Sequence, residues 1–106
     1  MSNPMNDSQI EEAVAKSPAP RITKEYMESR IVDVQYFSPP GESTTTYCRM
    51  VIDNGYAVSG ESACVNPENY NRELGQSIAY NNAFAKLWPL FGFLLAEGNY
   101  RAQQAA

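Results

Sequence analysis

A cysteine is the side chain in this sequence that comes closest to supporting covalent chemistry. Cys64 lies just ahead of a predicted helix start, where partial positive charge lowers the pKa of a thiol. The chain contains no histidine, so it lacks the commonest general base and the commonest metal ligand. Cys48 and Cys64 alone do not make a zinc site, and a small buried hydrophobic residue is the favoured interpretation of Cys64. An enzyme with Cys64 as nucleophile is the least favoured class of function, and no metal or cofactor is expected.

The residues that follow Cys64 include amide and aromatic side chains, which favour noncovalent binding instead. Asn81 and Asn82 interrupt an apolar helical stripe, where an amide destabilises the fold unless its groups are hydrogen-bonded. Either one faces solvent while the other bonds to a neighbouring backbone group, or one bonds to a ligand or a second subunit. Tyr70 is likewise either a core residue or a ring on which a base stacks. Both interpretations stay open for each residue.

Two cations complete the candidate ligand-binding set. Arg49 lies on the outward face of a predicted strand and Lys86 on a predicted helix, and both could reach a phosphate, although most surface cations are simply solvated. The chain has only eight Lys and Arg and a net charge of −4, which argues against duplex nucleic acid as a partner. No apolar run approaches the ~18 residues of a membrane span, and no signal peptide is apparent. We therefore expect a cytosolic protein with free thiols and no membrane partner.

The secondary structure that must position these residues begins with an N-terminal region that is expected to pack only weakly on the rest of the chain. The whole chain of 106 residues is expected to form one domain, with residues 1–18 as a flexible or weakly docked segment. A short helix is expected over residues 8–16 with Ser8 as its N-cap, followed by an extended linker at residues 17–20. A second helix should run over residues 24–30 with Thr23 as N-cap and with Tyr26 and Met27 in the core.

Alternation of apolar and polar residues with a period of two then predicts strands. Residues 31–37 should form a strand with Val32, Val34 and Tyr36 on one face, and residues 44–53 a second strand. The triplet Asp53-Asn54-Gly55 predicts a hairpin. A two-residue loop would split the apolar residues between the faces, so we favour a three-residue loop with a glycine bulge that pairs Ile52 with Tyr56 and Met50 with Val58. This register places the following residues on one face: Cys48, Met50, Ile52, Tyr56 and Val58.

The C-terminal half predicts two helices. The sheet should end after residues 60–62, and Asn66-Pro67-Glu68 is typical of a helix start. After an irregular turn at residues 69–71 this helix should run to Trp88, where Pro89 ends or kinks it. Its expected core stripe is Leu74, Ile78, Ala85 and Trp88, with Phe84 alongside. A last helix over residues 90–97, capped by Gly98, and a loose tail over residues 100–106 complete the prediction.

The predicted fold class is therefore α+β. We expect a small antiparallel sheet of three or more strands around the Asn54-Gly55 hairpin, packed with two C-terminal helices and short N-terminal helices. Eleven per cent aromatic residues is a large share for so small a core, so some of these rings should line an interface or a pocket.

The string NGYAVSGESACVNPENYNRELGQSIAYNNAFAKLWPLFGF resembles the signature of a family of small tailed-bacteriophage accessory proteins, the phage N-four gene-forty-nine-like family. Residues 19–23 and the pair Tyr36-Phe37 also resemble the N-terminal half of that family, so that the resemblance covers residues 19–95. The most specific parts are GESACV-x-PEN-[FY] and IA-x-x-NA-x-x-KLWPL. Phe91 departs from the pattern, because many family members carry an acid there.

The family includes the first-type anti-Thoeris sponge proteins, and the resemblance implies a function. It implies a phage anti-defence protein that binds a cyclic ADP-ribose isomer without cleaving it, in the cytoplasm of the infected bacterial host. Some members also bind cyclic oligonucleotides, and members form homo-oligomers with pockets near subunit contacts. The expected ligand-binding residues are Tyr70, Asn82, Asn81, Arg49 and Lys86, with Tyr80 as another ring for the base. The alternative is an acidic protein-binding inhibitor of a host factor.

Overall fold

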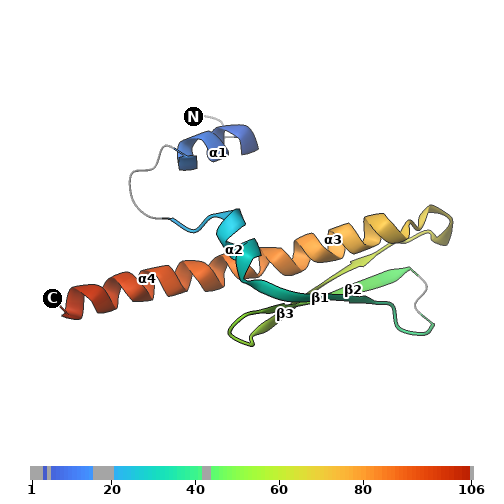
Figure 1. The fold of residues 1–106 in the computed structure, drawn as a ribbon. Helices are drawn as coiled ribbons and strands as arrows, with labels where there is room; N and C mark the ends of the chain where they lie inside the picture. The colour runs from blue at the N-terminus through green and yellow to red at the C-terminus, as the bar shows by residue number, and fades with distance from the viewer. Residues whose placement is uncertain (1–3, 5, 16–20, 42–43, 106) are drawn as a thin grey trace.

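Three antiparallel strands and two long C-terminal helices form most of the structure (Figure 1). The computed structural model describes residues 4, 6–15, 21–41 and 44–105. The sheet has the order β1 (Ile31–Phe37), β2 (Thr45–Ile52), β3 (Ala57–Ala63). The helices are α1 (Asp7–Ala15), α2 (Lys24–Arg30), α3 (Arg72–Ala85) and α4 (Leu87–Ala105), and a 3-10 turn, η1 (Pro67–Asn69), precedes α3. The predicted α+β class is confirmed.

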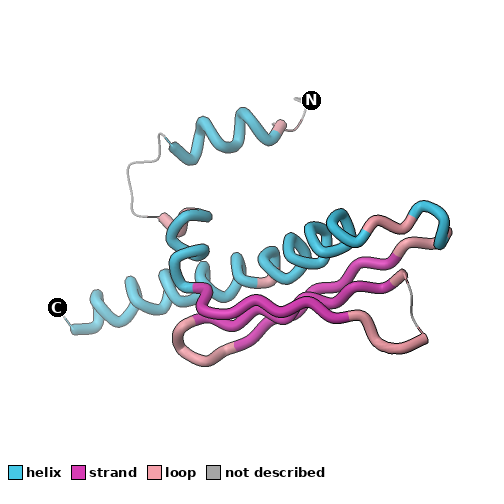
Figure 2. Tube along the Cα trace, turned by 45° about the vertical axis from the view of Figure 1, so that its right-hand side comes forward, coloured by secondary structure: helices cyan, strands magenta, loops and turns pink. Residues whose placement is uncertain are grey.

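The long helices form one rod across the molecule (Figures 1 and 2). α3 lies along one face of the sheet, and α4 continues the line of α3 past the end of the sheet. α2 leads directly into β1 near the junction of α3 and α4. The core of the described chain lies between these parts and consists of Met27, Cys48, Met50, Ile52, Ala79, Ala83, Phe84, Leu87 and Phe91.

The two N-terminal helices are capped by local side chains. Asn6 and Gln9 each accept a hydrogen bond from the other's backbone N–H, at 2.8 and 3.0 Å, so that α1 begins after Asn6 instead of at the expected cap Ser8. The predicted linker, residues 17–20, and Lys16 lie outside the described residues. Thr23 caps α2 as predicted, since its hydroxyl accepts from the Tyr26 N–H at 3.1 Å.

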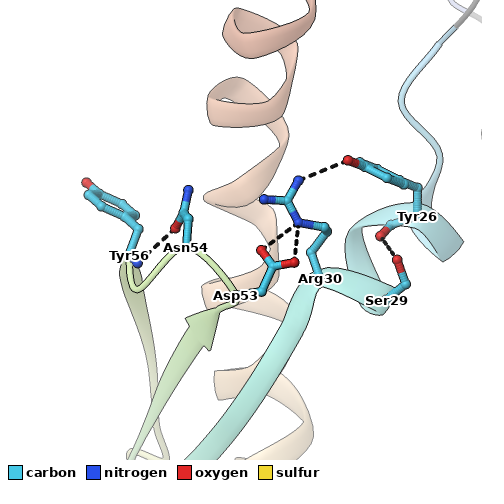
Figure 3. Close-up of polar contacts among 6 residues, drawn as sticks. All are labelled: Tyr26, Ser29, Arg30, Asp53, Asn54 and Tyr56. Carbon is cyan, nitrogen blue, oxygen red and sulfur yellow. Dashed lines mark hydrogen bonds and ion pairs between the residues drawn. The ribbon is translucent and has the colours of Figure 1, made fainter.

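α2 is tied to the hairpin by a charged contact (Figure 3). The Arg30 Nε donates to both oxygens of Asp53, at 2.6 and 2.8 Å, and another guanidinium nitrogen donates to the Tyr26 hydroxyl at 2.9 Å. These bonds raise the pKa of Arg30, chiefly through Asp53. Met27 is buried as predicted, but Tyr26 is 46% exposed, because its hydroxyl lies at this solvated contact. The Arg30 guanidinium also lies 5.3 Å from the ring centre of Phe91.

The hairpin has the predicted three-residue loop. Met50 pairs with Val58, the Ile52 N–H donates to the Tyr56 oxygen at 3.0 Å, and Gly55 adopts φ +91°, which favours glycine. Cys48, Met50 and Ile52 are buried as expected, whereas Tyr56 is exposed at the tip of the hairpin. β3 continues to Ala63, one residue beyond the expected end of the sheet.

The first strand contains an irregularity that changes its faces. The pairing with β2 shifts between Ile31 and Asp33, so that Val32 has no opposite residue and points away from the core. Ile31 and Val34 both pack against the core instead. The expected face of Val32, Val34 and Tyr36 is therefore wrong at Val32, which is largely exposed.

The buried face of α3 is the clearest correction to the prediction. Ala79, Ala83 and Phe84 face the sheet, while the expected stripe of Leu74, Ile78, Ala85 and Trp88 is exposed. The reason is Gly60 on β3, where an added Cβ would lie 2.3 Å from the Ala83 nitrogen and 2.5 Å from the Ala79 oxygen. Only small residues allow the helix backbone to approach so closely.

The junction and the tail also differ from expectation. α3 ends at Ala85, earlier than Trp88, and Lys86 keeps helical backbone angles before α4 begins. Pro89 is the third residue of α4, in the first turn, where a missing N–H removes no hydrogen bond within that helix. Gly98 does not cap this helix, which continues to Ala105 and carries an ion pair between Glu97 and Arg101. The predicted loose tail is thus helical as far as Ala105.

The contact at Gly60 gives a stability prediction. Gly60→Ala should lower the free energy of unfolding by about 3 kcal/mol, because the new methyl group meets backbone atoms that cannot rotate away. Gly92→Ala is the matched control, since an added Cβ there meets no atom within 4 Å, and it should raise stability by about 0.5–1 kcal/mol. Urea denaturation followed by circular dichroism measures both. Equal stability of the two variants would contradict the proposed close packing.

Candidate functional site

A hollow of about 380 Å³ lies where β1 ends and α3 begins. We call it the Tyr70 hollow, and its lining residues are Tyr36, Phe37, Ser38, Thr46, Tyr70, Arg72 and Gln76. Its volume is at the small end of the ~300–1,000 Å³ typical of ligand pockets. Three aromatic rings, one guanidinium and one amide surround it, which suits a ligand with both a planar ring and an anionic or hydroxyl-bearing part.

Two asparagine caps hold the segment that carries Tyr70. The Asn66 side chain accepts from the Glu68 N–H at 3.0 Å and begins η1, and the Asn71 side chain accepts from the Leu74 N–H at 3.1 Å and begins α3. Tyr70 is fixed between these caps. Its hydroxyl lies 3.4 Å from the hydroxyl of Thr46, which is a buried side chain of β2. The ring position is therefore set by both local sequence and a tertiary contact.

The charges around the Tyr70 hollow favour an anionic group. Arg72 is exposed at the first position of α3, where the backbone N–H groups also carry partial positive charge. Burial raises the pKa of the Tyr36 phenol, with smaller contributions from Cys48 and Tyr80, so Tyr36 stays protonated near neutral pH. A protonated phenol can donate as well as accept a hydrogen bond.

A smaller cavity of about 160 Å³ also adjoins Tyr70. Cys64 lines it, and the Cys64 thiol donates to the Asn66 oxygen at 3.1 Å. The Ser62 hydroxyl donates to the Gly75 oxygen at 2.7 Å and holds α3 against β3 at this point. Leu74 and Ile78 complete its apolar wall. Cys48, by contrast, is fully buried as predicted, and burial raises its thiol pKa.

Three of the other expected ligand-binding residues, Asn82, Lys86 and Arg49, lie close to β3. The Asn82 amide donates to the Glu61 backbone oxygen at 2.8 Å, and Asn81 is exposed to solvent. Lys86 lines a hollow of about 130 Å³ together with Tyr47, Ser59 and Glu61. Arg49 is exposed and pairs in the sheet with Ser59. Tyr70 and Lys86 line different hollows, so the five expected residues do not form one site.

Sequence reasoning missed Arg72, Tyr36 and Gln76 as members of the Tyr70 hollow. Arg72 carries the signal that could have identified it, because a cation in the first turn of a helix opposes the helix dipole. Such a departure from the local rule is often found at a binding site. Tyr36 could not have been placed there without knowing that the end of β1 lies beside the start of α3.

Within the described residues, no group of three or more His, Cys, Asp and Glu side chains is placed to hold a metal ion. In the same part of the chain, no helix is long and apolar enough to cross a membrane.

The comparisons with known proteins agree with the resemblance noted from the sequence. The model of the phage protein (N4 Gp49/phage Sf6 gene 66) family matches residues 22–98, which is more than half of the chain. Neither the curated proteins nor the solved structures gave a match. The matched region includes all of the sheet, α3 and both asparagine caps. On this match, the chain belongs to the phage protein (N4 Gp49/phage Sf6 gene 66) family.

Proposed function

We propose that this protein is a phage anti-defence protein that binds and sequesters a cyclic nucleotide immune signal without cleaving it. The proposed ligand is the cyclic ADP-ribose isomer of the Thoeris system, with cyclic oligonucleotides as a second ligand class. The protein would act in the cytoplasm of the infected bacterial host. The resemblance to sponge proteins suggests this activity, and the Tyr70 hollow is the observation that supports it best.

The composition of the Tyr70 hollow suits a nucleotide. The rings of Tyr36 and Tyr70 offer apolar faces on which an adenine can stack. Arg72 offers a guanidinium that can form paired hydrogen bonds to a phosphate. Gln76 and the hydroxyl of Ser38 can bond ribose hydroxyls. None of the seven lining residues is an acid, a histidine or a cysteine, which favours binding over turnover.

A second copy of the chain is part of the proposal. The Tyr70 hollow provides one cation, whereas a diphosphate carries two negative phosphates. Its volume is also small for a ligand with a base and two sugars. We infer that a homodimer or higher homo-oligomer completes the pocket, with further cations from the second copy. Arg49, Lys86, Asn81 and Asn82 are the ligand contacts of the alternative placement along β3.

Recovery of the ligand tests sequestration. Purified protein is mixed with the product of a bacterial TIR-domain enzyme, separated from free ligand, and then heated to denature it. Intact ligand in the supernatant, measured by liquid chromatography and mass spectrometry, is the expected result. Appearance of a cleaved product would instead identify an enzyme, and failure of the protein to retain ligand would rule out the sponge function.

Two charge variants distinguish the proposed placement from the alternative. Arg72→Ala should weaken binding by about 1.5–3 kcal/mol, the range for a hydrogen bond to a charged group, while Lys86→Ala should leave it within ~0.5 kcal/mol. Both side chains are exposed, so neither variant should change the thermal midpoint by more than a few degrees. Isothermal titration calorimetry measures the two affinities. The reverse order of effects would move the site to the surface along β3.

The cysteine prediction separates binding from catalysis. Cys64→Ser should retain ligand as well as the parent does, because Cys64 does not line the Tyr70 hollow and its thiol donates to the Asn66 oxygen. The serine hydroxyl can donate the same hydrogen bond to the Asn66 oxygen. Calorimetry with the same ligand measures the affinity. Loss of a ligand-consuming activity in Cys64→Ser would favour the enzyme that we rank last.

An acidic inhibitor of a host protein remains the second candidate. The observation that favours it is the exposed apolar surface of α3, which includes Leu74 and Ile78 and has no cover in the described part of the chain. A pull-down from host lysate without nucleotide would then recover one protein in a fixed ratio to this chain.

A further inference from the structure

The Tyr70 hollow contains an amide that the fold itself does not use. Gln76 lies in the second turn of α3, is half-buried and lines the hollow. In the described part of the chain, its side chain forms no hydrogen bond to another residue. An amide that is partly withdrawn from water destabilises a protein unless its donor and acceptor find partners. The Gln76 amide is therefore available to a ligand in the hollow.

The lining residues of the hollow differ in depth. Thr46 is 2% exposed and Tyr70 and Gln76 are half-buried, so these three residues form the inner end. Ser38 and Arg72 are exposed and form part of the mouth. A phosphate loses far more hydration energy on burial than an uncharged base does. The base of a bound nucleotide should therefore occupy the inner end, with its phosphates at the mouth beside Arg72.

Arg72 and Gln76 are placed to bind two parts of one ligand. They are four residues apart on α3, which puts their Cβ atoms ~5–6 Å from each other on one face of the helix. Among the described residues, the Arg72 side chain also has no ion-pair or hydrogen-bond partner. The rings of Tyr36 and Tyr70 border the same hollow and offer faces on which a base can stack. A guanidinium, an amide and two rings can thus contact a nucleotide at the same time.

An amide side chain distinguishes adenine from bases that carry an oxygen in place of the amine. One edge of adenine presents the N6 amine as a donor and N7 as an acceptor, and a glutamine amide accepts from the first and donates to the second. Guanine presents O6 and N7, which are both acceptors, at that edge, and hypoxanthine does the same. In either orientation the Gln76 amide then bonds to one acceptor and turns its own oxygen toward the other, which leaves polar groups unpaired.

Of the described residues that line the hollow, only Gln76 favours adenine in this way. Four of the others carry hydroxyls, which rotate and act as donors or acceptors, so they bond to either kind of base. Phe37 can only stack. The Arg72 guanidinium only donates, and it would favour guanine if it reached the base edge. Its exposed position at the mouth favours a phosphate instead.

We propose that Gln76 gives the Tyr70 hollow a preference for adenine, by accepting a hydrogen bond from the N6 amine and donating one to N7. A ribose hydroxyl would use one of the two groups of the amide, whereas the adenine edge uses both. The inference rests on the proposed function, because it requires a nucleotide in the hollow. It adds which base is selected and which residue selects it.

Two ligands that differ in one group test the inference. The first is the product of the TIR-domain enzyme, and the second is its hypoxanthine counterpart, in which an oxygen replaces the N6 amine. Isothermal titration calorimetry measures the dissociation constant of each. The parent should bind the adenine ligand about 10- to 100-fold more tightly, which is the discrimination that one base contact through two hydrogen bonds provides.

Gln76→Met removes the amide and keeps a side chain of similar length. It should weaken binding of the adenine ligand about 10-fold and bind the two ligands with equal affinity to within about 2-fold. A change that only disturbed the fold would weaken both ligands alike and keep their ratio. Gln103→Met is the matched control, because it makes the same substitution at an exposed position of α4 that does not line the hollow. It should keep both affinities of the parent.

Gln76→Glu provides a second measurement at the same position. Its carboxylate still accepts from the N6 amine but cannot donate to N7. This variant should bind both ligands more weakly than the parent and still prefer adenine. A preference of Gln76→Glu for the hypoxanthine ligand would contradict the inference. Far-UV circular dichroism checks that each variant keeps its helices.

The outcomes separate this inference from the proposed function. A parent that binds both ligands equally, or a folded Gln76→Met variant that keeps the parent ratio, would overturn the role of Gln76 and leave the sponge function standing. A parent that prefers the hypoxanthine ligand would also overturn it, and would assign the base edge to Arg72. A parent that binds neither ligand would overturn both the sponge function and the inference.

Discussion

The close approach of α3 to β3 at Gly60 determines how the rest of this structure is arranged. Because an added Cβ at Gly60 would lie within 2.8 Å of three backbone atoms of α3, the strand and the helix are in backbone contact there. Ala79 and Ala83 are therefore the residues that face the sheet, and larger side chains must lie elsewhere on the helix. The same approach brings Asn82 within hydrogen-bond distance of the Glu61 oxygen. One glycine thus sets the rotation of α3 about its axis.

That rotation also places the Tyr70 hollow. Farther along the same contact, an added Cβ at Gly75 would lie 3.0 Å from the Thr46 hydroxyl, and the Ser62 hydroxyl bonds to the Gly75 oxygen. The first turn of α3 is therefore held over the start of β2, and Arg72 and Tyr70 come to lie beside the end of β1. The hollow is formed by residues far apart in sequence, so its shape depends on the packing of α3 and not on the caps alone.

Local patterns in the sequence were sufficient for much of the fold. The Thr23 cap, the bounds of α2 and β1 and the three-residue hairpin loop all depend on contacts within a few residues, and each was predicted. The errors arise where a distant residue decides the outcome. Leu74 and Ile78 are larger apolar residues than Ala79 and Ala83, and nothing within α3 itself shows that Gly60 selects the alanines for the buried face. The irregularity at Val32 likewise follows from the pairing of two strands.

The exposed apolar face of α3 has a physical meaning of its own. A hydrophobic face of the correct helical period is normally buried, and the period alone does not say by what. Here one face of α3 packs on its own sheet, and the face that carries Leu74 and Ile78 is exposed. Leu74 and Ile78 also line the cavity that adjoins Tyr70. A second copy that covered them would therefore lie next to the proposed ligand site. Binding of ligand and association of chains would then be thermodynamically linked, because the second copy would contribute to that site.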